Sequence, residues 1–120
     1  MRIFVSHAQA FDFKNKLYNP LIYSTLNNEH QIFFPHESKA ETNTYNEIVN
    51  SDLVIAEVSE PSIGVGIELG WAHSLKVPII CLYSRRVKPS KSLKYLTKMF
   101  VEYRNIEDMM SKLMHIVETL

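Results

Sequence analysis

Residues that could do chemistry gather in one short segment of this 120-residue chain, EPSIGVGIELG at positions 60–70. The segment holds all three glycines of the sequence, together with Ser62 and a carboxylate, Glu68. A carboxylate can act as nucleophile, acid or base, a serine hydroxyl can bind an anion, and glycines let a ligand approach the backbone. The segment matches neither the G-x-G-x-x-G pattern of dinucleotide sites nor the Gly-Lys-Ser/Thr pattern of phosphate loops.

The elements around this segment alternate between strands and helices. Nearly continuous apolar runs, DLVIAEV at 52–58 and VPIICLY at 77–83, are typical of strands buried on both faces of a parallel sheet. Apolar residues three and four positions apart over 106–120 predict a closing amphipathic helix. We therefore expect one α/β domain over residues 1–120. Its predicted architecture is a three-layer sandwich with a mostly parallel sheet of about five strands, Rossmann-like or flavodoxin-like.

The glycine-containing segment follows the strand predicted at 52–58, so it lies at the carboxyl edge of the sheet, where such proteins bind ligands. We expect residues 59–66 to form a loop and the next helix to begin near Ile67. Ser62 and Glu68 could also be purely structural, because serine caps helices and a carboxylate is favoured in a first turn. Capping does not require a pair of glycines, which favours a binding site.

Composition restricts the partners of the chain. Thirteen basic and thirteen acidic residues cancel, so no overall charge would attract polymeric nucleic acid, and no apolar run is long enough for a membrane span. The single cysteine, Cys81, lies in an apolar run and favours a reducing compartment, so we expect the cytoplasm. None of the five histidines lies three or four residues from another, and we expect neither a metal nor a cofactor.

Residues 51–83, SDLVIAEVSEPSIGVGIELGWAHSLKVPIICLY, resemble the nucleoside 2-deoxyribosyltransferase superfamily and look closest to its 2′-deoxynucleoside 5′-phosphate N-hydrolases. The resemblance implies that Glu68 is the nucleophile that attacks the anomeric carbon of the sugar. It also implies that Ser62 holds the 5′-phosphate and that Gly64 and Gly66 let the sugar lie against the main chain.

Three weaker correspondences extend the implied site. Ser6 falls where the family has a phosphate-contacting serine, and His36 falls near a family histidine beside the nucleobase. Ser92 matches a serine that reaches the phosphate of the neighbouring subunit, so the resemblance implies a homodimer or higher homo-oligomer. The basic run at 84–94, with five lysines and arginines, would add positive charge near that phosphate.

One residue departs from the family pattern in a way that affects the chemistry. The family usually has an aspartate in the segment before the AEV strand, and Thr44 occupies that position here. Threonine is no acid at neutral pH, so the proton for the departing base would come from Glu47, Glu41 or His36. Glu47 lies three residues after Thr44, on roughly the same helical face, and is the second expected catalytic residue.

The sequence therefore predicts an N-glycosidase that hydrolyses the base–sugar bond of (deoxy)nucleoside 5′-monophosphates through a glycosyl-enzyme intermediate. Two alternatives stay open. One is a nucleoside 2-deoxyribosyltransferase, which is disfavoured because its members have a longer chain and an N-terminal tyrosine. The other is a non-catalytic nucleotide-binding or signalling module that has lost the catalytic acid, as Thr44 would allow.

Overall fold

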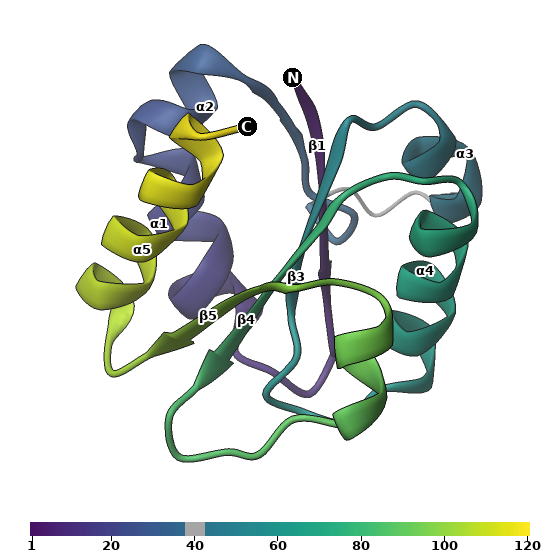
Figure 1. Cartoon of the computed structure of the whole chain (residues 1–120). Coiled ribbons are helices and arrows are strands. Elements are labelled where there is room, and N and C mark those ends of the chain that lie inside the picture. Colours follow the sequence, from purple (N-terminus) through teal and green to yellow (C-terminus); the bar gives the residue numbers. More distant parts are fainter. Residues whose placement is uncertain (38–42) are drawn as a thin grey trace.

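The computed structural model describes residues 1–37 and 43–120. Its centre is a sheet of five strands in the order β2-β1-β3-β4-β5, and every neighbouring pair is parallel (Figure 1). The predicted α/β sandwich with a parallel sheet is confirmed, and the strand order is that of the flavodoxin-like type. The strands are β1 (Arg2–His7), β2 (Gln31–Phe33), β3 (Leu53–Glu57), β4 (Ile79–Ser84) and β5 (Met99–Tyr103).

Helices cover both faces of the sheet (Figure 1). One face carries a π-helical turn (Lys14–Tyr18) that continues into α1 (Asn19–Ile22), then α2 (Thr25–Glu29) and α5 (Ile106–Glu118). The other carries α3 (Thr44–Val49) and α4 (Ile63–Ser74), and a 3₁₀-helical turn (Lys91–Tyr95) precedes β5. In the part of the chain that the structure describes, no helix is long and apolar enough to cross a membrane.

The two-sided core explains why the central strands are apolar at nearly every position. In β3, Leu53 and Ile55 pack on the α5 side, while Val54 and Ala56 pack on the α4 side. Successive side chains of a strand point to opposite faces, so a strand covered on both faces needs apolar residues in both registers. By the same alternation, Ser6 points toward α4 and its neighbour His7 points toward the π-helical turn.

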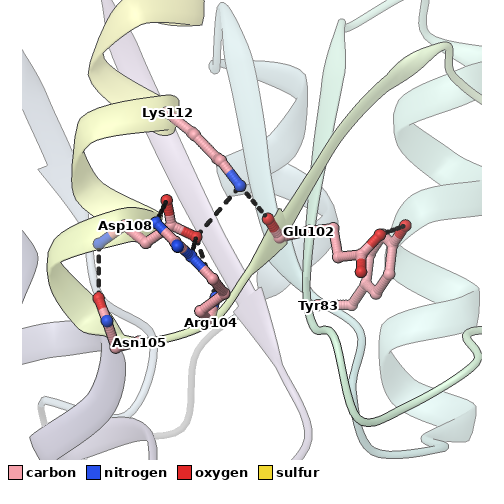
Figure 2. A network of polar contacts seen from close by, with 6 residues as sticks. All are labelled: Tyr83, Glu102, Arg104, Asn105, Asp108 and Lys112. Carbon is pink, nitrogen blue, oxygen red and sulfur yellow. Dashed lines mark hydrogen bonds and ion pairs between the residues drawn. The ribbon is translucent and has the colours of Figure 1, made fainter.

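A surface network secures the start of α5 against β5 (Figure 2). The Asn105 side chain caps the helix by accepting a hydrogen bond from the Asp108 backbone N–H at 2.8 Å. Asp108 also pairs with Arg104 and Lys112, and Lys112 donates to the backbone carbonyl of Glu102 at 2.7 Å. Hydrogen bonds and charge from Arg104 and Lys112 lower the pKa of Asp108 to about 2. This network lies on the edge strand and anchors the helix there.

The topology places a switch point between the carboxyl ends of β1 and β3. The chain leaves β1 toward β2 on one side and leaves β3 toward β4 on the other, so the direction of winding reverses between these two strands. Ligands of open α/β sheets bind at such a switch point. Ser6, His7 and Glu57 end the two strands there.

Candidate active site

Glu68 lies in the second turn of α4 and faces the end of β1. The fully buried Ser6 hydroxyl donates a hydrogen bond to Glu68 Oε1 at 2.7 Å. Burial raises the pKa of Glu68, while hydrogen bonds from the Ser6 and Thr44 side chains and the charge of His36 lower it. The Ser6 hydroxyl therefore holds the carboxylate in a partly desolvated position, with the Thr44 side chain near it. The Ser6 hydroxyl is directed at this carboxylate and away from solvent.

The start of α3 brings Thr44 to the same carboxylate. Asn43 caps this helix by accepting a hydrogen bond from the Asn46 backbone N–H at 3.2 Å, which sets the position of Thr44 in the first turn. A second carboxylate at position 44 would raise the pKa of Glu68, whereas the neutral hydroxyl lowers it. Glu47 lies one turn further along and shares no hydrogen bond with Glu68 in the described structure. Glu41 lies outside the described residues.

An aromatic cluster of His7, Phe13, Tyr18 and His36 lies at the carboxyl end of β1. His7 stacks on Phe13 with ring centroids 4.2 Å apart, and the His36 ring lies 5.0 Å from that of His7 and 5.5 Å from that of Phe13. The charge of His36 acts on Glu68. His36 is therefore close enough for its charge to act on Glu68, and the flat rings of His7 and Phe13 lie beside it.

The hydrogen bonds within this cluster fix the protonation of His7. Its Nδ1 lies 3.0 Å from the Ala8 carbonyl oxygen, which can only accept, so Nδ1 carries the proton. Nε2 then accepts from the Tyr18 hydroxyl at 2.6 Å, and that hydroxyl accepts from the His36 backbone N–H at 3.1 Å. Burial lowers the pKa of His7 to about 4 and raises that of Tyr18 to about 12. Both side chains are neutral near pH 7.

Sequence reasoning did not identify His7, Phe13 and Tyr18. Tyr18 reads as an ordinary core residue, because its hydroxyl partner comes from a strand 11 positions earlier in the chain. Residues 11–29 hold a π-helical turn and two short helices in place of one continuous helix. Pro20 has no backbone N–H, so it cannot make the hydrogen bond that a continuous α-helix needs there.

The expected start of α4 was wrong by one turn. The helix begins at Ile63 and not near Ile67, because the Ser62 hydroxyl accepts a hydrogen bond from the Val65 backbone N–H at 3.2 Å and caps it. Gly64 and Gly66 therefore lie inside the helix, and neither has a positive φ. A Cβ at Gly64 would lie 3.8 Å from the Ser62 hydroxyl oxygen, and one at Gly66 would meet no atom within 4 Å. Packing within the chain does not require either glycine.

A cavity of about 410 Å³ lies beside the start of α4. One wall is the β3–α4 loop with the first turns of α4, including Ser62 and Gly66, and the other is the segment 87–96, including Lys88 and Ser92. Ser62 and Ser92, expected to meet across a subunit interface, thus line one cavity within a single chain. Glu68 does not line it, because Glu68 and Gly66 lie about 160° apart around the helix.

The predicted residues thus form two groups on either side of the first turns of α4. Ser6, His36 and Thr44 lie around Glu68 at the switch point between β1 and β3. Ser62, Gly66 and Ser92 line the cavity. Gly64 lies one turn before Glu68 on the same face of the helix. No group of three or more His, Cys, Asp or Glu side chains suited to a metal ion occurs within residues 1–37 and 43–120.

Comparisons with known proteins give a consistent result. No family model matches the chain. A curated protein of Nematostella vectensis, named provisionally as a 2′-deoxynucleoside 5′-phosphate N-hydrolase, is 39% identical over 82 residues, which are 62% of this chain and 54% of that protein. The 5-hydroxymethyl-dUMP N-hydrolase of Esox lucius is 45% identical over 51 residues, 42% of this chain and 34% of that protein.

These matches confirm the resemblance to the nucleotide N-hydrolases, and they span about half or less of the length of these curated relatives. Among solved structures, a CMP N-glycosidase of Clostridium botulinum aligns with a TM-score of 0.72 and 22% identity, over 94% of this chain and 98% of that one. A conserved protein of Enterococcus faecalis V583 aligns with the same TM-score, 15% identity and 97% coverage of this chain. At these identities the structural likeness establishes the shared fold.

Proposed function

From the premise that this chain resembles the 2′-deoxynucleoside 5′-phosphate N-hydrolases, we propose that it hydrolyses the base–sugar bond of nucleoside 5′-monophosphates. The observation that carries the proposal is the hydrogen bond from Ser6 to Glu68 at 2.7 Å, at the switch point of the sheet. It fixes one carboxylate oxygen of a half-buried glutamate that feels the charge of His36, whose ring lies 5.0 Å from that of His7. That is a suitable arrangement for an oriented nucleophile.

The reaction would proceed in two steps with retained configuration at the sugar. A Glu68 carboxylate oxygen attacks the anomeric carbon, the C–N bond breaks, and its electron pair leaves with the base, which takes up a proton. Water then attacks the same carbon, the bond to Glu68 breaks, and the sugar phosphate leaves. Ser6 and Thr44 would hold the carboxylate in line throughout, and their hydroxyls favour its ionised form.

His36 is the better candidate to assist the leaving base. Its charge acts on Glu68, and its ring lies against His7 and Phe13, where a flat base could stack. Glu47 remains the second candidate, and it would have to reach the base from one turn beyond Thr44. An imidazole can donate the proton in the first step and accept one from water in the second.

We propose the cavity beside α4 for the 5′-phosphate, in which case the sugar crosses the first turn of α4 past Gly64 to bring its anomeric carbon to Glu68. Ser62 and Ser92 supply hydroxyls, Lys88 supplies positive charge, and Gly66 leaves its side of the helix open. The exposed Arg85 and Arg86 precede the same wall. A phosphate here would lie near the N-terminus of α4, which favours anions.

Three further proposals concern the molecule as a whole. Residues 1–120 would act as one domain, and the protein would work in the cytoplasm as a homodimer or higher homo-oligomer. Cys81 suits a reducing compartment, since burial raises the pKa of its thiol to about 12 and leaves it unreactive. Sedimentation at several protein concentrations would test the oligomer.

The test of the function is release of free base from a panel of ribo- and deoxyribonucleoside monophosphates and the matching nucleosides. Release from monophosphates that is lost in Glu68→Gln, a variant that keeps an acceptor for Ser6, is the expected result. Adding a second free base would reveal a deoxyribosyltransferase by the appearance of a new nucleoside. If no substrate releases base while a monophosphate still raises the melting temperature, the chain is the binding module that Thr44 allows.

A further inference from the structure

A second buried carboxylate, Glu57, ends β3 at the same edge of the sheet. It is 1% exposed and points to the face opposite Glu68, because it shares the register of Leu53 and Ile55 in the α5-side core. Among the described residues, no lysine, arginine or histidine lies within ion-pair distance of it. A buried carboxylate is costly unless its oxygens accept hydrogen bonds, so its partners show why it is tolerated.

Three donors satisfy Glu57. The Ser59 backbone N–H donates to Oε1 at 2.6 Å, the Ser59 hydroxyl donates to Oε2 at 3.0 Å, and the Tyr103 hydroxyl donates a very short hydrogen bond to Oε2. Burial raises the pKa of Glu57, and each of these donors lowers it. The first two contacts hold the chain in a fixed turn as it leaves β3.

The same contacts tie three strand ends together. The Ser59 hydroxyl accepts from the Ser84 backbone N–H at the end of β4, at 2.9 Å. The Arg85 backbone N–H donates to the Tyr103 carbonyl at the end of β5, at 3.0 Å. The cluster of Glu57, Ser59, Ser84 and Tyr103, which we call the strand-end cluster, therefore joins β3, β4 and β5 where they stop.

The two walls of the cavity both start from this cluster. Residues 58–62 follow Glu57 and carry Ser62, while residues 85–96 follow Ser84 and carry Ser92. We propose that Glu57 is a positioning residue that sets the separation of these walls, and through it the site of the substrate's phosphate. The inference rests on the proposed function in taking the cavity as the phosphate site.

The test removes one hydroxyl from the strand-end cluster with Tyr103→Phe, which keeps the ring. The matched control is Tyr83→Phe, because the Tyr83 hydroxyl contacts Glu102 at 3.4 Å on the exposed side of the sheet edge. In Tyr103→Phe we expect KM for the cleaved monophosphate to rise about tenfold, because one hydrogen bond to a buried charge is lost. The kcat and the KM of the matching nucleoside should stay within about twofold of wild type. The control should match wild type in all three.

Amide hydrogen exchange gives a readout that does not depend on activity. Tyr103→Phe should speed exchange of amides in 58–62 and 84–96 about tenfold, while amides of β1 and α5 exchange as in wild type. Ser59→Ala, which removes the hydroxyl between Glu57 and Ser84, should reproduce the pattern and serves if Tyr103→Phe does not fold. Faster exchange throughout the molecule would show a purely structural role and overturn the inference.

The two readouts separate failure of this inference from failure of the proposed function. A wild-type protein that cleaves monophosphates, with the KM unchanged in both cluster variants, would overturn the positioning role and leave the enzyme assignment intact. A wild-type protein that cleaves nothing overturns the enzyme assignment. In that case the affinity of Tyr103→Phe for CMP is measured by calorimetry and compared with that of wild type. An affinity about tenfold lower than that of wild type would support the positioning role. Faster local exchange with an unchanged affinity would overturn it as well.

Discussion

The neutral state of His7 predicts how stability changes with pH. Its pKa is lowered to about 4 by burial against Phe13 and Tyr18, whereas a histidine in the unfolded chain titrates near 6.5. Because the unfolded state binds the proton at higher pH than the folded state, the contribution of His7 to the free energy of unfolding falls as pH drops below about 6.5. The loss is complete below about pH 4.

The size of the effect follows from the two pKa values. Because the pKa of His7 is lowered by this amount, the free energy of unfolding falls by ~2 kcal/mol between about pH 7.5 and pH 5. Screening by solvent reduces this change to ~1–2 kcal/mol. Glu57 and Glu68 act in the opposite direction. Their pKa values are raised, so their contributions become more favourable as pH falls toward the pKa of unfolded glutamate. The effect of His7 must therefore be measured as a difference between variants.

The assay is urea unfolding of wild type and His7→Gln at both pH values. Glutamine can still donate to the Ala8 carbonyl and accept from Tyr18, but it does not titrate. Wild type should lose ~1–2 kcal/mol more than the variant on going from about pH 7.5 to pH 5. His115→Gln, at an exposed position of α5, is the control and should behave as wild type. An equal change in wild type and His7→Gln would refute the assigned protonation of the cluster.

Three further predictions concern the site itself. Ser62→Ala should raise KM for monophosphates more than for nucleosides in steady-state assays, and equal effects on both substrates would exclude a phosphate-binding role. Through loss of the α4 cap it should also lower the free energy of unfolding by ~1 kcal/mol. His36→Gln should lower kcat about 100-fold and Glu47→Gln less than about threefold, and the reverse order would assign the acid to Glu47. Glu68→Gln should be more stable than wild type at pH 7.5 in urea unfolding, because burial raises the pKa of this carboxyl and its ionised form costs stability. The difference in stability should shrink as pH falls toward the pKa of unfolded glutamate. A difference that does not change with pH would contradict this cause.

Sequence patterns predicted the fold because they are local and repeated. The runs at 52–58 and 77–83 are apolar in both strand registers, which only a strand covered on both faces requires. The periodic residues of α5 have a single buried face, so its helix was predicted at 106–120 and is found at Ile106–Glu118. The start of α4 was misplaced because two glycines resemble loop residues, whereas the cap at Ser62 decides the boundary.

The site was predictable only in part, because its contacts join distant residues. Glu68 and Ser62 were identified by a dense local motif, but the hydrogen bond from Ser6 spans 62 positions and depends on the register of β1 beside β3. The partnership of His7 with Tyr18 follows no periodicity. Glu57 reads as the polar end of an apolar strand, and nothing local shows that it is buried and joined to Tyr103.

The central claim is that Glu68 is the nucleophile, and the most direct test is the intact mass of the protein during turnover. Wild type, mixed rapidly with a cleaved monophosphate and quenched in acid, should carry a sugar-phosphate adduct on the peptide that contains Glu68. Glu68→Gln should carry none and release no base. Base release by wild type without an adduct, together with undiminished release by Glu68→Gln, would contradict the account.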